Sequence, residues 1–509
     1  MEESDRGLKE VLAEFERRTG LPGVEREFKE RTDGGALIIY LANPNDRFYR
    51  ILQEVLSSAP TEPQAPPATI KTRAEGNRVQ SPEGRYLLRT LSESLNISRF
   101  SFKEDFFARY TKSVSGAEAQ VTAAANHVVF GRRGAGKSSL LLYALHARDP
   151  VNQPSAWIDM QLYEKRADNR VVLDLFSEVM KQCEPLLRLN PELSITQALV
   201  DRLRNNGTLA DDTIGKILPD LRRLFGRNAS GAKDLFIFLD DFHALDVDLQ
   251  PKLPGFIYSV TRGNNIFLKL SAIETLTKTW DSQAHTGLQA PHDAQTIKLD
   301  YNLTMPDKAA KHIEAILDAH AVYCGLPSVR FLCTSSEVIS RLVWVSAGVP
   351  RDALNMFAQA MTKGATVGQN RVSVTNVNLA ASEMVSQKLR ELEIDAPAPE
   401  EGELRDVLER VKDFCVKEKR KNAFLIEIRN DSSLYRQVLK LIDLRLVHVI
   451  SEGITVGEAG RKYLGLILDY GFYTGIRAAQ SVDLFNKQTE RVAYKDLRKL
   501  PVLAEPRQA

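Results

Sequence analysis

The sequence predicts an α/β protein with a mostly parallel central sheet, a helical subdomain after it, a C-terminal winged helix and a small α+β domain in front. Two observations support this fold class. Five short apolar segments alternate with helical patterns, which is typical of a parallel sheet covered on both faces. The first of these segments leads directly into a glycine-rich loop and a second apolar run, VVFGRRGAGKSSLLLYAL, at residues 128–145.

The five predicted strands read HVVFG, SAWIDMQL, LFIFLDD, IFLKLSAI and QTIKLD. In front of them, two strands around an Asp33-Gly34-Gly35 turn and flanking helical patterns indicate the small domain. Stretches rich in proline and polar residues indicate linkers. We expect a small α+β domain at 1–60, a linker at 61–82, the sheet domain at 83–303, the helical subdomain at 304–393, a second linker at 394–403, and the winged helix with further C-terminal helices at 404–509.

The C-terminal part shows the order of a winged helix-turn-helix: two helices, then a two-stranded element around Glu452-Gly453, with a long helix expected over 460–477. Arg436, Lys440 and Arg445 are expected on the recognition helix, and a basic cluster lies at 417–421. Acidic residues between these cations leave the region mildly basic. DNA or RNA binding and a structural or protein-docking role therefore both stay open.

Composition excludes several classes of protein. The chain has 509 residues and a formal charge of +2, so net charge gives no general attraction to nucleic acid. The four cysteines are scattered without a CxxC pair, which predicts buried thiols rather than zinc or disulfides. The charged beginning of the chain and the lack of a long apolar run predict a cytoplasmic protein that does not cross a membrane.

The loop after the first strand fits the pattern G-x-x-x-x-G-K-[ST], with a strand before it and a helix after it. Glycines let backbone N–H groups surround phosphate oxygens, and the following helix adds its N-terminal dipole. Lys137 is expected to reach the β and γ phosphates, and the Ser138 hydroxyl to bind Mg²⁺. The residues predicted to bind nucleotide in this loop are Gly131, Gly134, Gly136, Lys137, Ser138 and Ser139.

Two acids follow the strand LFIFLDD at its carboxyl end, where ligands bind in open α/β sheets. Asp240 is predicted to share the metal ion with Ser138, and Asp241 to orient or deprotonate the attacking water. Aspartate is one methylene shorter than the glutamate that could take this role. Hydrolysis is therefore expected to be slow or to need another subunit.

The strand–loop–helix, the Asp-Asp pair, the next strand and the motif GVPRDAL together resemble an AAA+ ATPase. More narrowly, residues 83–480 are similar to prokaryotic origin-recognition-complex-like ATPases, which end in a winged helix, and the Asp-Asp pair is shared with STAND signalling NTPases. The resemblance implies that the helical subdomain is a lid whose Arg351 contacts the γ-phosphate. It also implies that Ser271 senses this phosphate.

Two features of the resemblance are incomplete. A trans-acting arginine normally follows the fourth strand, yet residues 274–329 contain no arginine. Arg262 and Lys278 are the nearby cations, and both are equally well interpreted as surface charge. The segment 100–116 often packs over adenine in such ATPases, so its aromatic residues provide either an adenine wall or the core-facing side of a helix. These residues are Phe106, Phe107 and Tyr110.

The expected activity is slow ATP hydrolysis with Mg²⁺, and Asp241, Lys137 and Arg351 are the expected catalytic residues. We expect a nucleotide-controlled homo-oligomeric switch that engages nucleic acid or, through the N-terminal domain, an effector protein. The resemblance also suggests antiphage defence or mobile-element biology. The alternative is a STAND-like signalling scaffold that recruits a protein partner without binding nucleic acid. A dedicated metabolic enzyme is not supported, because the sequence shows no second catalytic motif.

Overall fold

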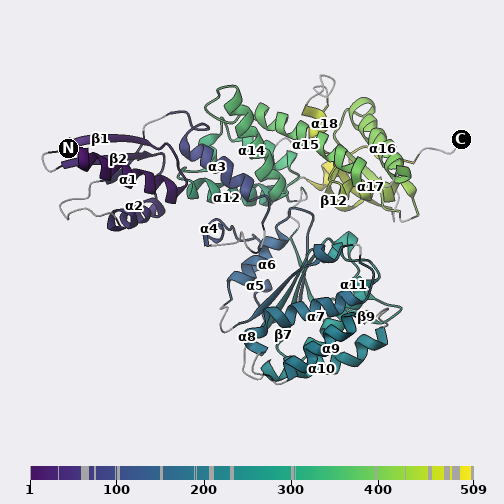
Figure 1. The fold of residues 1–509 in the computed structure, drawn as a ribbon. Coiled ribbons are helices and arrows are strands. Elements are labelled where there is room, and N and C mark those ends of the chain that lie inside the picture. The colour runs from purple at the N-terminus through teal and green to yellow at the C-terminus, as the bar shows by residue number, and fades with distance from the viewer. Residues whose placement is uncertain are drawn as a thin grey trace. The chain divides into compact units, whose positions relative to one another are not determined.

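The computed structural model describes residues 2–31, 34–58, 68–73, 76–97, 99, 104–148, 153–164, 166–187, 190, 192–205, 211–229, 234–299, 303, 305–395, 398–429, 431–456, 461–474, 482–483 and 493–505. The chain divides into two compact units. One consists of Met1–Asn96, Glu104–Thr111 and Tyr301–Ala509, and the other of Ile97–Lys103 and Lys112–Asp300. Figure 1 shows the elements of both units.

The second unit is built on a parallel sheet of five strands, and these are the five that the sequence predicts. The strands are β4 (His127–Phe130), β5 (Ser155–Asp159), β6 (Leu235–Asp240), β7 (Ile266–Ala272) and β10 (Gln295–Lys298). Their order in the sheet is β10-β4-β7-β6-β5, and all neighbours run parallel. The strand that leads into the glycine-rich loop therefore lies inside the sheet. The prediction of a parallel α/β fold is confirmed.

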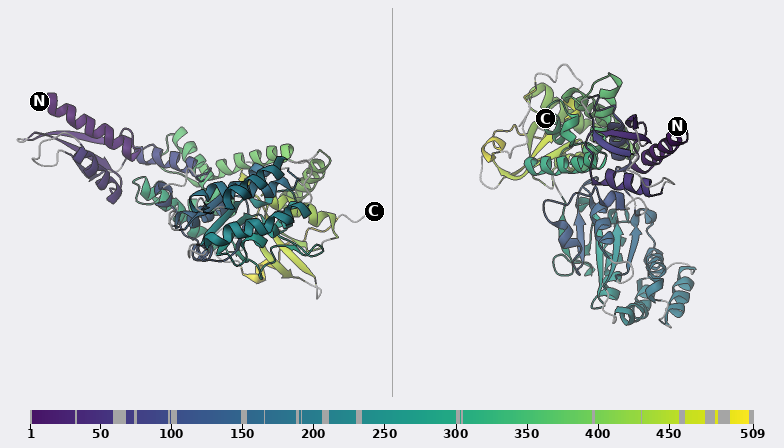
Figure 2. Two further views of the ribbon diagram at one scale, coloured as in Figure 1. Left: turned by 60° about the horizontal axis from the view of Figure 1, so that its bottom comes forward. Right: turned by 90° about the vertical axis from the view of Figure 1, so that its left-hand side faces the viewer.

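Helices cover both faces of this sheet (Figures 1 and 2). Phe236 and Phe238 of β6 pack into one apolar cluster, while the alternating Ile237 and Leu239 pack into another. This alternation is why a strand buried on both faces reads as one continuous apolar run. The helices of the unit are α5 (Ala117–Val121), α6 (Lys137–His146), α7 (Arg170–Gln182), α8 (Glu184–Leu187), α9 (Glu192–Asn205), α10 (Asp211–Ala229) and α11 (Leu249–Thr261).

Short elements complete the second unit. They are the 3₁₀ turns η1 (Met160–Tyr163), η2 (Phe242–Ala244) and η3 (Glu274–Leu276), and the small hairpin of β8 (Trp280–Asp281) and β9 (Thr286–Gly287). The turns η1 and η2 directly follow β5 and β6. They therefore lie at the carboxyl ends of two neighbouring strands.

The N-terminal part of the first unit is a three-stranded sheet with two helices. It contains α1 (Glu2–Thr19), β1 (Glu25–Arg31), β2 (Gly34–Leu41), α2 (Asp46–Ser58) and β3 (Ala68–Thr72), in the sheet order β1-β2-β3. Both helices share one apolar cluster with β2. The third strand lies within 61–82, which the sequence predicts as a linker. The strand β3 pairs with β2 in parallel and buries alternate side chains, whereas the prolines before it, at 60–67, lie outside the described residues.

The N-terminal sheet is attached to the rest of its unit rather than separate from it. The Asn43 N–H donates to the Gly325 carbonyl at 2.9 Å, and the Arg47 guanidinium lies 4.1 Å from the ring centroid of Tyr323. Glu83 is fully buried at the start of α3 (Pro82–Glu93), where it accepts from the Arg73 guanidinium at 3.0 Å. A buried ion pair needs fixed partners, so the expectation of a flexible connection at 61–82 is corrected for this segment.

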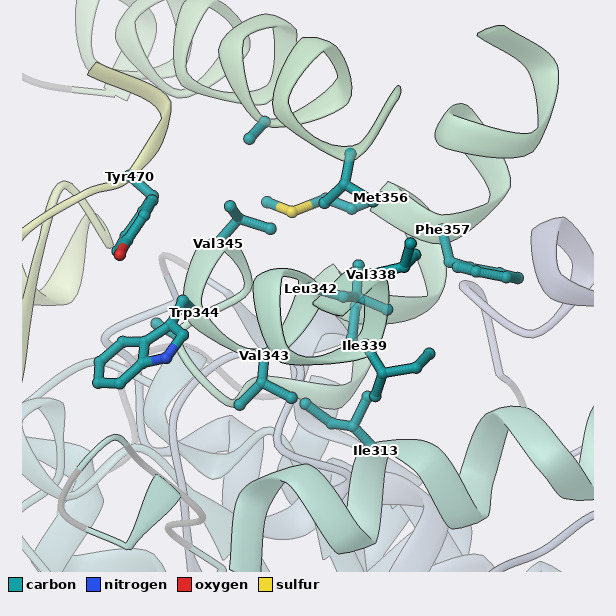
Figure 3. Packing of buried hydrophobic residues seen from close by; sticks show 14 of the residues in the cluster. Ile313, Val338, Ile339, Leu342, Val343, Trp344, Val345, Met356, Phe357 and Tyr470 are labelled. Carbon is teal, nitrogen blue, oxygen red and sulfur yellow. The ribbon is translucent and has the colours of Figure 1, made fainter. Parts of the chain in front are cut away.

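The helical subdomain consists of α12 (Pro306–Tyr323), α13 (Glu337–Val345), α14 (Pro350–Thr366) and α15 (Val374–Asp395), as the sequence predicts, with the 3₁₀ turn η4 at Val329–Leu332. The helix α13 is central to its core. Figure 3 shows Ile339 and Val343 of α13 near Ile313 of α12, and Trp344 near Tyr470 from the C-terminal part. The short α4 (Glu104–Phe107) belongs to the same unit.

The C-terminal part is a winged helix with three strands. It contains α16 (Ala398–Asp413), the π-helical turn η5 (Phe414–Glu418), β11 (Ala423–Glu427), α17 (Ser433–Asp443), β12 (Val447–Thr455) and β13 (Lys462–Leu468), followed by the short α18 (Gly471–Thr474) and α19 (Tyr494–Leu497). The antiparallel sheet has the order β11-β13-β12. The predicted linker at 394–403 is largely helical, since α15 ends at Asp395 and α16 begins at Ala398; residues 396–397 lie outside the described residues.

Two expectations for this part are wrong. Glu452 and Gly453 lie inside β12 at a register shift, so they do not form the turn between the strands. The expected long helix over 460–477 is instead the strand β13, whose residues from Tyr463 to Leu468 are all buried. An unbroken apolar run of this length is compatible with a buried strand or a buried helix, and here the sheet pairing decides.

Candidate nucleotide-binding site

The glycine-rich loop connects β4 to α6 in a conformation that needs its glycines. Gly134 and Gly136 have φ of 81° and 95°, in the left-handed region that side chains disfavour. A Cβ at Gly131 would lie 3.2 Å from the Cβ of Ala135 and 3.3 Å from that of Leu299. A Cβ at Gly136 would have no atom within 4 Å. The loop is therefore tight at its start and open where α6 begins.

Lys137 and Ser138 are the first two residues of α6, so their side chains lie at the helix N-terminus. Lys137 is 6% exposed, and its Nζ donates to the Arg132 carbonyl at 3.3 Å. The ammonium group is thus folded back over its own loop. Ser139 follows on the same helical turn. The partial positive charge of a helix N-terminus and the buried ammonium both favour an anion at this place.

Three oxygen-bearing side chains from three elements meet at the carboxyl end of β6. The hydroxyls of Ser138 and Ser271 both donate to Asp240 Oδ1, at 3.1 Å and 2.5 Å. Burial and the neighbouring charge of Asp241 raise the pKa of Asp240 to about 6. A cation beside the carboxylate would favour its ionised form. The structure therefore brings together the predicted metal residues, Ser138 and Asp240, and the predicted sensor residue Ser271.

Asp241 directs its backbone and its side chain to different partners. Its φ is 52°, and its N–H donates to Asp240 Oδ1 at 3.1 Å and to the Ser271 hydroxyl at 3.0 Å. Its carboxylate is partly exposed and accepts from the Gln161 amide at 2.8 Å. The His243 ring lies 4.0 Å away, and burial lowers the pKa of this ring to about 4, so it is neutral. One oxygen of Asp241 therefore remains available to a water molecule.

Gln161 is the residue of the site that the sequence reading missed. It lies in η1, two residues after β5 ends, and β5 pairs with β6 so that Asp159 is opposite Asp240. Its position in the sequence could have indicated it, because polar residues that follow neighbouring parallel strands meet at one edge of the sheet.

Arg351 is the second residue of α14 and belongs to the first compact unit, whereas the loop and both acids belong to the second. Its side chain is exposed and makes no hydrogen bond or ion pair with the described part of the chain. The contact of Arg351 with a γ-phosphate stays a prediction.

The other expectations from the resemblance also stay predictions. The Arg109 guanidinium lies 5.6 Å from the Phe106 ring centroid and 4.8 Å from that of Tyr323, so this aromatic segment packs within the first unit. Phe107 and Tyr110 belong to the same segment. Arg262 directly follows α11, with its guanidinium 5.8 Å from the Tyr258 ring centroid. Lys278 pairs with Asp281 at 2.8 Å, as a surface residue does.

The winged helix offers a smaller basic surface than the sequence predicts. Arg436 and Lys440 are exposed on α17, one helical turn apart. Arg445 lies beyond the end of α17, and its guanidinium donates to both carboxylate oxygens of Asp352 at 2.7 and 2.9 Å. The expectation that Arg445 belongs to a recognition helix is therefore wrong. In the cluster at 417–421, Lys417 pairs with Asp413 at 2.6 Å.

The donor set fits Mg²⁺ and a nucleotide phosphate. Mg²⁺ prefers oxygen ligands and is bound through one or two carboxylates together with substrate phosphates. Ser138 and Asp240 provide such oxygens beside the open end of the glycine-rich loop. No group of three or more His, Cys, Asp or Glu side chains within the described ranges forms another metal site. All four cysteines are buried, and none of them is in a disulfide.

Comparison with known proteins finds similar chains among solved structures alone. No family model matches the chain, and no curated protein matches it. Similar structures include Cdc6p from Pyrobaculum aerophilum, with 14% identity, 70% of this chain and 88% of that chain covered, and a TM-score of 0.35. The Aeropyrum pernix ORC1 protein in complex with DNA has 16% identity, coverage of 76% and 95%, and a TM-score of 0.39.

Drosophila ORC bound to DNA is also similar, with 12% identity, 85% of this chain and 98% of that chain covered, and a TM-score of 0.37. With TM-scores below 0.5, the likenesses carry no weight for function. The fold assignment rests on the parallel strand order and the loop after β4, and the chemistry rests on the residues of the site. No helix among the described residues is long and apolar enough to cross a membrane.

Proposed function

We propose that this chain binds ATP with Mg²⁺ at the carboxyl edge of the parallel sheet and hydrolyses it slowly. One observation carries the proposal: Ser138, Asp240 and Ser271 converge within hydrogen-bond distance beside a loop that depends on left-handed glycines. The three residues come from α6, β6 and β7, which are far apart in the sequence. A chance glycine-rich turn does not require this convergence.

The residues of the site have distinct roles in the proposed reaction. The loop N–H groups and the Lys137 ammonium bind the phosphate oxygens of ATP. Ser138 and Asp240 would hold Mg²⁺, which neutralises charge on the phosphates when bound. Asp241 orients the attacking water and accepts its proton, while the Gln161 amide holds the other carboxylate oxygen in place. Ser271 fixes Asp240 and the backbone of Asp241 together.

Two features support slow turnover. Asp241 extends one methylene less than glutamate, and its hydrogen bond with Gln161 holds it at the edge of the site. The region 274–329 contains no arginine that could reach the ATP site of a neighbouring subunit. Slow hydrolysis suits a switch, because the ATP-bound state then persists.

We propose that Arg351 recognises the γ-phosphate, so that the ATP-bound and ADP-bound forms differ in assembly. The partner is nucleic acid, contacted through Arg436 and Lys440 of α17.

Calorimetry tests the nucleotide site. Replacing Lys137 by Ala removes the ammonium group from the β and γ phosphates, and we expect ATP affinity to fall by about 100-fold, since charge-assisted contacts each contribute about 1.5–3 kcal/mol. Lys181→Ala, which removes an exposed lysine from the last turn of α7, is the matched control and should bind ATP as the wild type does. Wild-type affinity in Lys137→Ala would refute the nucleotide site.

A further inference from the structure

The helix that carries Arg351 is tied to the winged helix by its next residue. Asp352 lies in the first turn of α14, and its side chain is 7% exposed. Both of its oxygens accept hydrogen bonds from Arg445, at 2.7 and 2.9 Å. Arg445 lies between α17 and β12 of the winged helix. This partly buried pair therefore links the N-terminus of α14 to the end of the candidate recognition helix.

The backbone of Arg445 has an unusual conformation for an arginine. Its φ is 59°, its N–H donates to the Ile442 carbonyl at 2.9 Å, and the Leu446 N–H donates to the Leu441 carbonyl at 2.9 Å. This pattern is the Schellman ending of a helix, where glycine is the usual residue because it has no Cβ. An arginine kept in a strained position is an indication of function. From this position its side chain reaches Asp352.

A buried network of ion pairs also holds the backbone of Arg445 in place. Lys388 of α15 donates to the Arg445 carbonyl at 3.0 Å and to Asp469 Oδ2 at 2.8 Å. Asp469 directly follows β13, and His448 of β12 lies 2.9 Å from the same oxygen. The side chains of Lys388 and Asp469 are 3% and 1% exposed. Charges this deeply buried keep a single arrangement, because separating them leaves an uncompensated charge.

Apolar packing reinforces the connection. The rings of Trp344 on α13 and Tyr470 have centroids 6.3 Å apart (Figure 3). A Cβ at Gly471 would lie 2.3 Å from Val385 Cγ2 and 2.6 Å from the Ala381 carbonyl oxygen of α15, so the backbones approach as closely as glycine permits. The helical subdomain and the winged helix therefore share a continuous core as well as the ion pairs.

We propose that Asp352 and Arg445 are positioning residues that couple Arg351 to the winged helix, so that a nucleotide-dependent displacement of Arg351 moves α17 and β12 with it. This inference rests on the proposed function, in which Arg351 distinguishes ATP from ADP. It adds the route by which the γ-phosphate controls the orientation of the nucleic-acid surface. It also explains why Arg445 is not part of that surface.

The test compares the ratio of the dissociation constants for ADP and ATP, measured by calorimetry with Mg²⁺. Arg445→Met removes the charge and leaves the same left-handed backbone requirement, whereas Arg445→Lys restores one donor for Asp352. We expect the ratio to fall about fivefold or more in Arg445→Met and in Asp352→Asn, which is the usual size of a coupling free energy. Arg445→Lys should recover most of it. Arg330→Met, which breaks the exposed pair with Glu314, should leave the ratio unchanged.

Hydrogen exchange of the unmodified protein gives a second reading that does not depend on whether a variant folds. Exchanging ADP for a non-hydrolysable ATP analogue should change the protection of peptides 349–356 and 443–450 together. A change at 349–356 without one at 443–450 overturns the inference. If the ratio of the ADP and ATP dissociation constants falls in Arg351→Ala but keeps its wild-type value in Arg445→Met and Asp352→Asn, this inference is wrong and the proposed role of Arg351 stands. A wild-type ratio in Arg351→Ala overturns the assigned role of Arg351 and this inference with it.

Discussion

At the scale of single residues, the structure separates the roles of two adjacent acids. Asp240 is half-buried, and one of its carboxylate oxygens accepts hydrogen bonds from the hydroxyls of Ser138 and Ser271. Asp241 adopts a left-handed backbone, which aspartate tolerates better than most residues, and this turns its carboxylate away toward Gln161. Two carboxylates in different environments can therefore serve as a metal ligand and a base.

Replacing Asp241 by Asn tests the second of these roles. The amide keeps the size of the side chain and loses the proton acceptor. We expect ATP affinity close to that of the wild type and a fall in the rate of phosphate release of about 10²–10⁴-fold, the usual contribution of a general base. Single-turnover phosphate release and calorimetry measure the two quantities separately. Asp248→Asn, at an exposed acid before α11, is the control. Wild-type turnover in Asp241→Asn would show that another group positions the water.

At the scale of elements, charge burial fixes how α15 meets the winged helix. The positive charge of Lys388 and the hydrogen bond with His448 hold the pKa of Asp469 below its ordinary range, although burial alone raises it. Replacing Lys388 by Met leaves Asp469 buried without its main partner. We expect this variant to lose about 3–5 kcal/mol of the free energy of unfolding of the first unit, measured by calorimetric melting. Lys417→Met breaks the exposed pair with Asp413 and should change it by less than about 1 kcal/mol.

The pH dependence of this difference has a definite sign. A carboxyl whose pKa is lowered in the folded protein stabilises it above its unfolded pKa of about 3.9, and this contribution is lost as the pH falls. The wild type therefore loses the contribution of Asp469 under acid conditions, while Lys388→Met has little of it to lose. We expect the difference between the two melting temperatures to shrink as the pH is lowered from about 4 toward about 2, where the carboxyl of the unfolded chain takes up its proton. A constant difference across this range would show that Lys388 stabilises by packing alone.

The helix α17 carries the proposed nucleic-acid surface, and its charge is small. Each lysine or arginine that neutralises a phosphate contributes about one unit to the slope of log affinity against log salt. Arg436→Ala combined with Lys440→Ala should therefore weaken binding of duplex DNA and reduce this slope by about two. Arg89→Ala, which removes an exposed arginine from α3, should leave the slope unchanged. Equal salt slopes in all three proteins would favour the scaffold alternative, in which a protein is the partner.

Some elements could be predicted from the sequence because their signals are local. The five strands of the parallel sheet are buried on both faces, so each reads as a short apolar run between helices. The segments β3 and β13 were missed because their identity depends on a distant partner. A short run beside prolines becomes β3 by pairing with β2, and an ambiguous apolar run becomes β13 by pairing with β11 and β12.

The same limit applies to the site. The glycines, Lys137 and the two acids follow from a motif and from the end of a strand, so sequence reading finds them. Gln161 and the pairing of Arg445 with Asp352 depend on which segments meet in space. A basic residue near a helix looks the same in the sequence whether it faces solvent or a buried carboxylate.

At the scale of the whole molecule, the proposed nucleotide contacts fall in two compact units. Lys137, Ser138, Asp240 and Asp241 belong to one, and Arg351 belongs to the other, together with the N-terminal sheet and the winged helix. A ligand that binds residues of both units favours arrangements in which both can reach it. ADP lacks the γ-phosphate, so its differential affinity for such an arrangement is smaller. Nucleotide state should therefore bias how the two units meet, and with it the surfaces that neighbouring copies share.

Assembly is the measurable consequence of this bias. We expect mass photometry to show a larger species with a non-hydrolysable ATP analogue than with ADP, because the analogue retains the γ-phosphate. Removing the guanidinium in Arg351→Ala should abolish this difference while leaving ATP bound through Lys137. Arg371→Ala, at another arginine of the helical subdomain, serves as the control and should behave as the wild type does.

The result separates two kinds of molecule. A ligand with equal affinity for two states shifts neither, however tightly it binds. Identical mass distributions in both nucleotides would therefore mean that the γ-phosphate makes no differential contact with the first unit, and the chain would be a constitutive scaffold. A difference that survives in Arg351→Ala would keep the switch and assign its trigger to the second unit, where Ser271 and Asp241 are hydrogen-bonded beside the proposed phosphate site. Loss of the difference in Arg351→Ala alone places the trigger on α14, next to the residue that holds the winged helix.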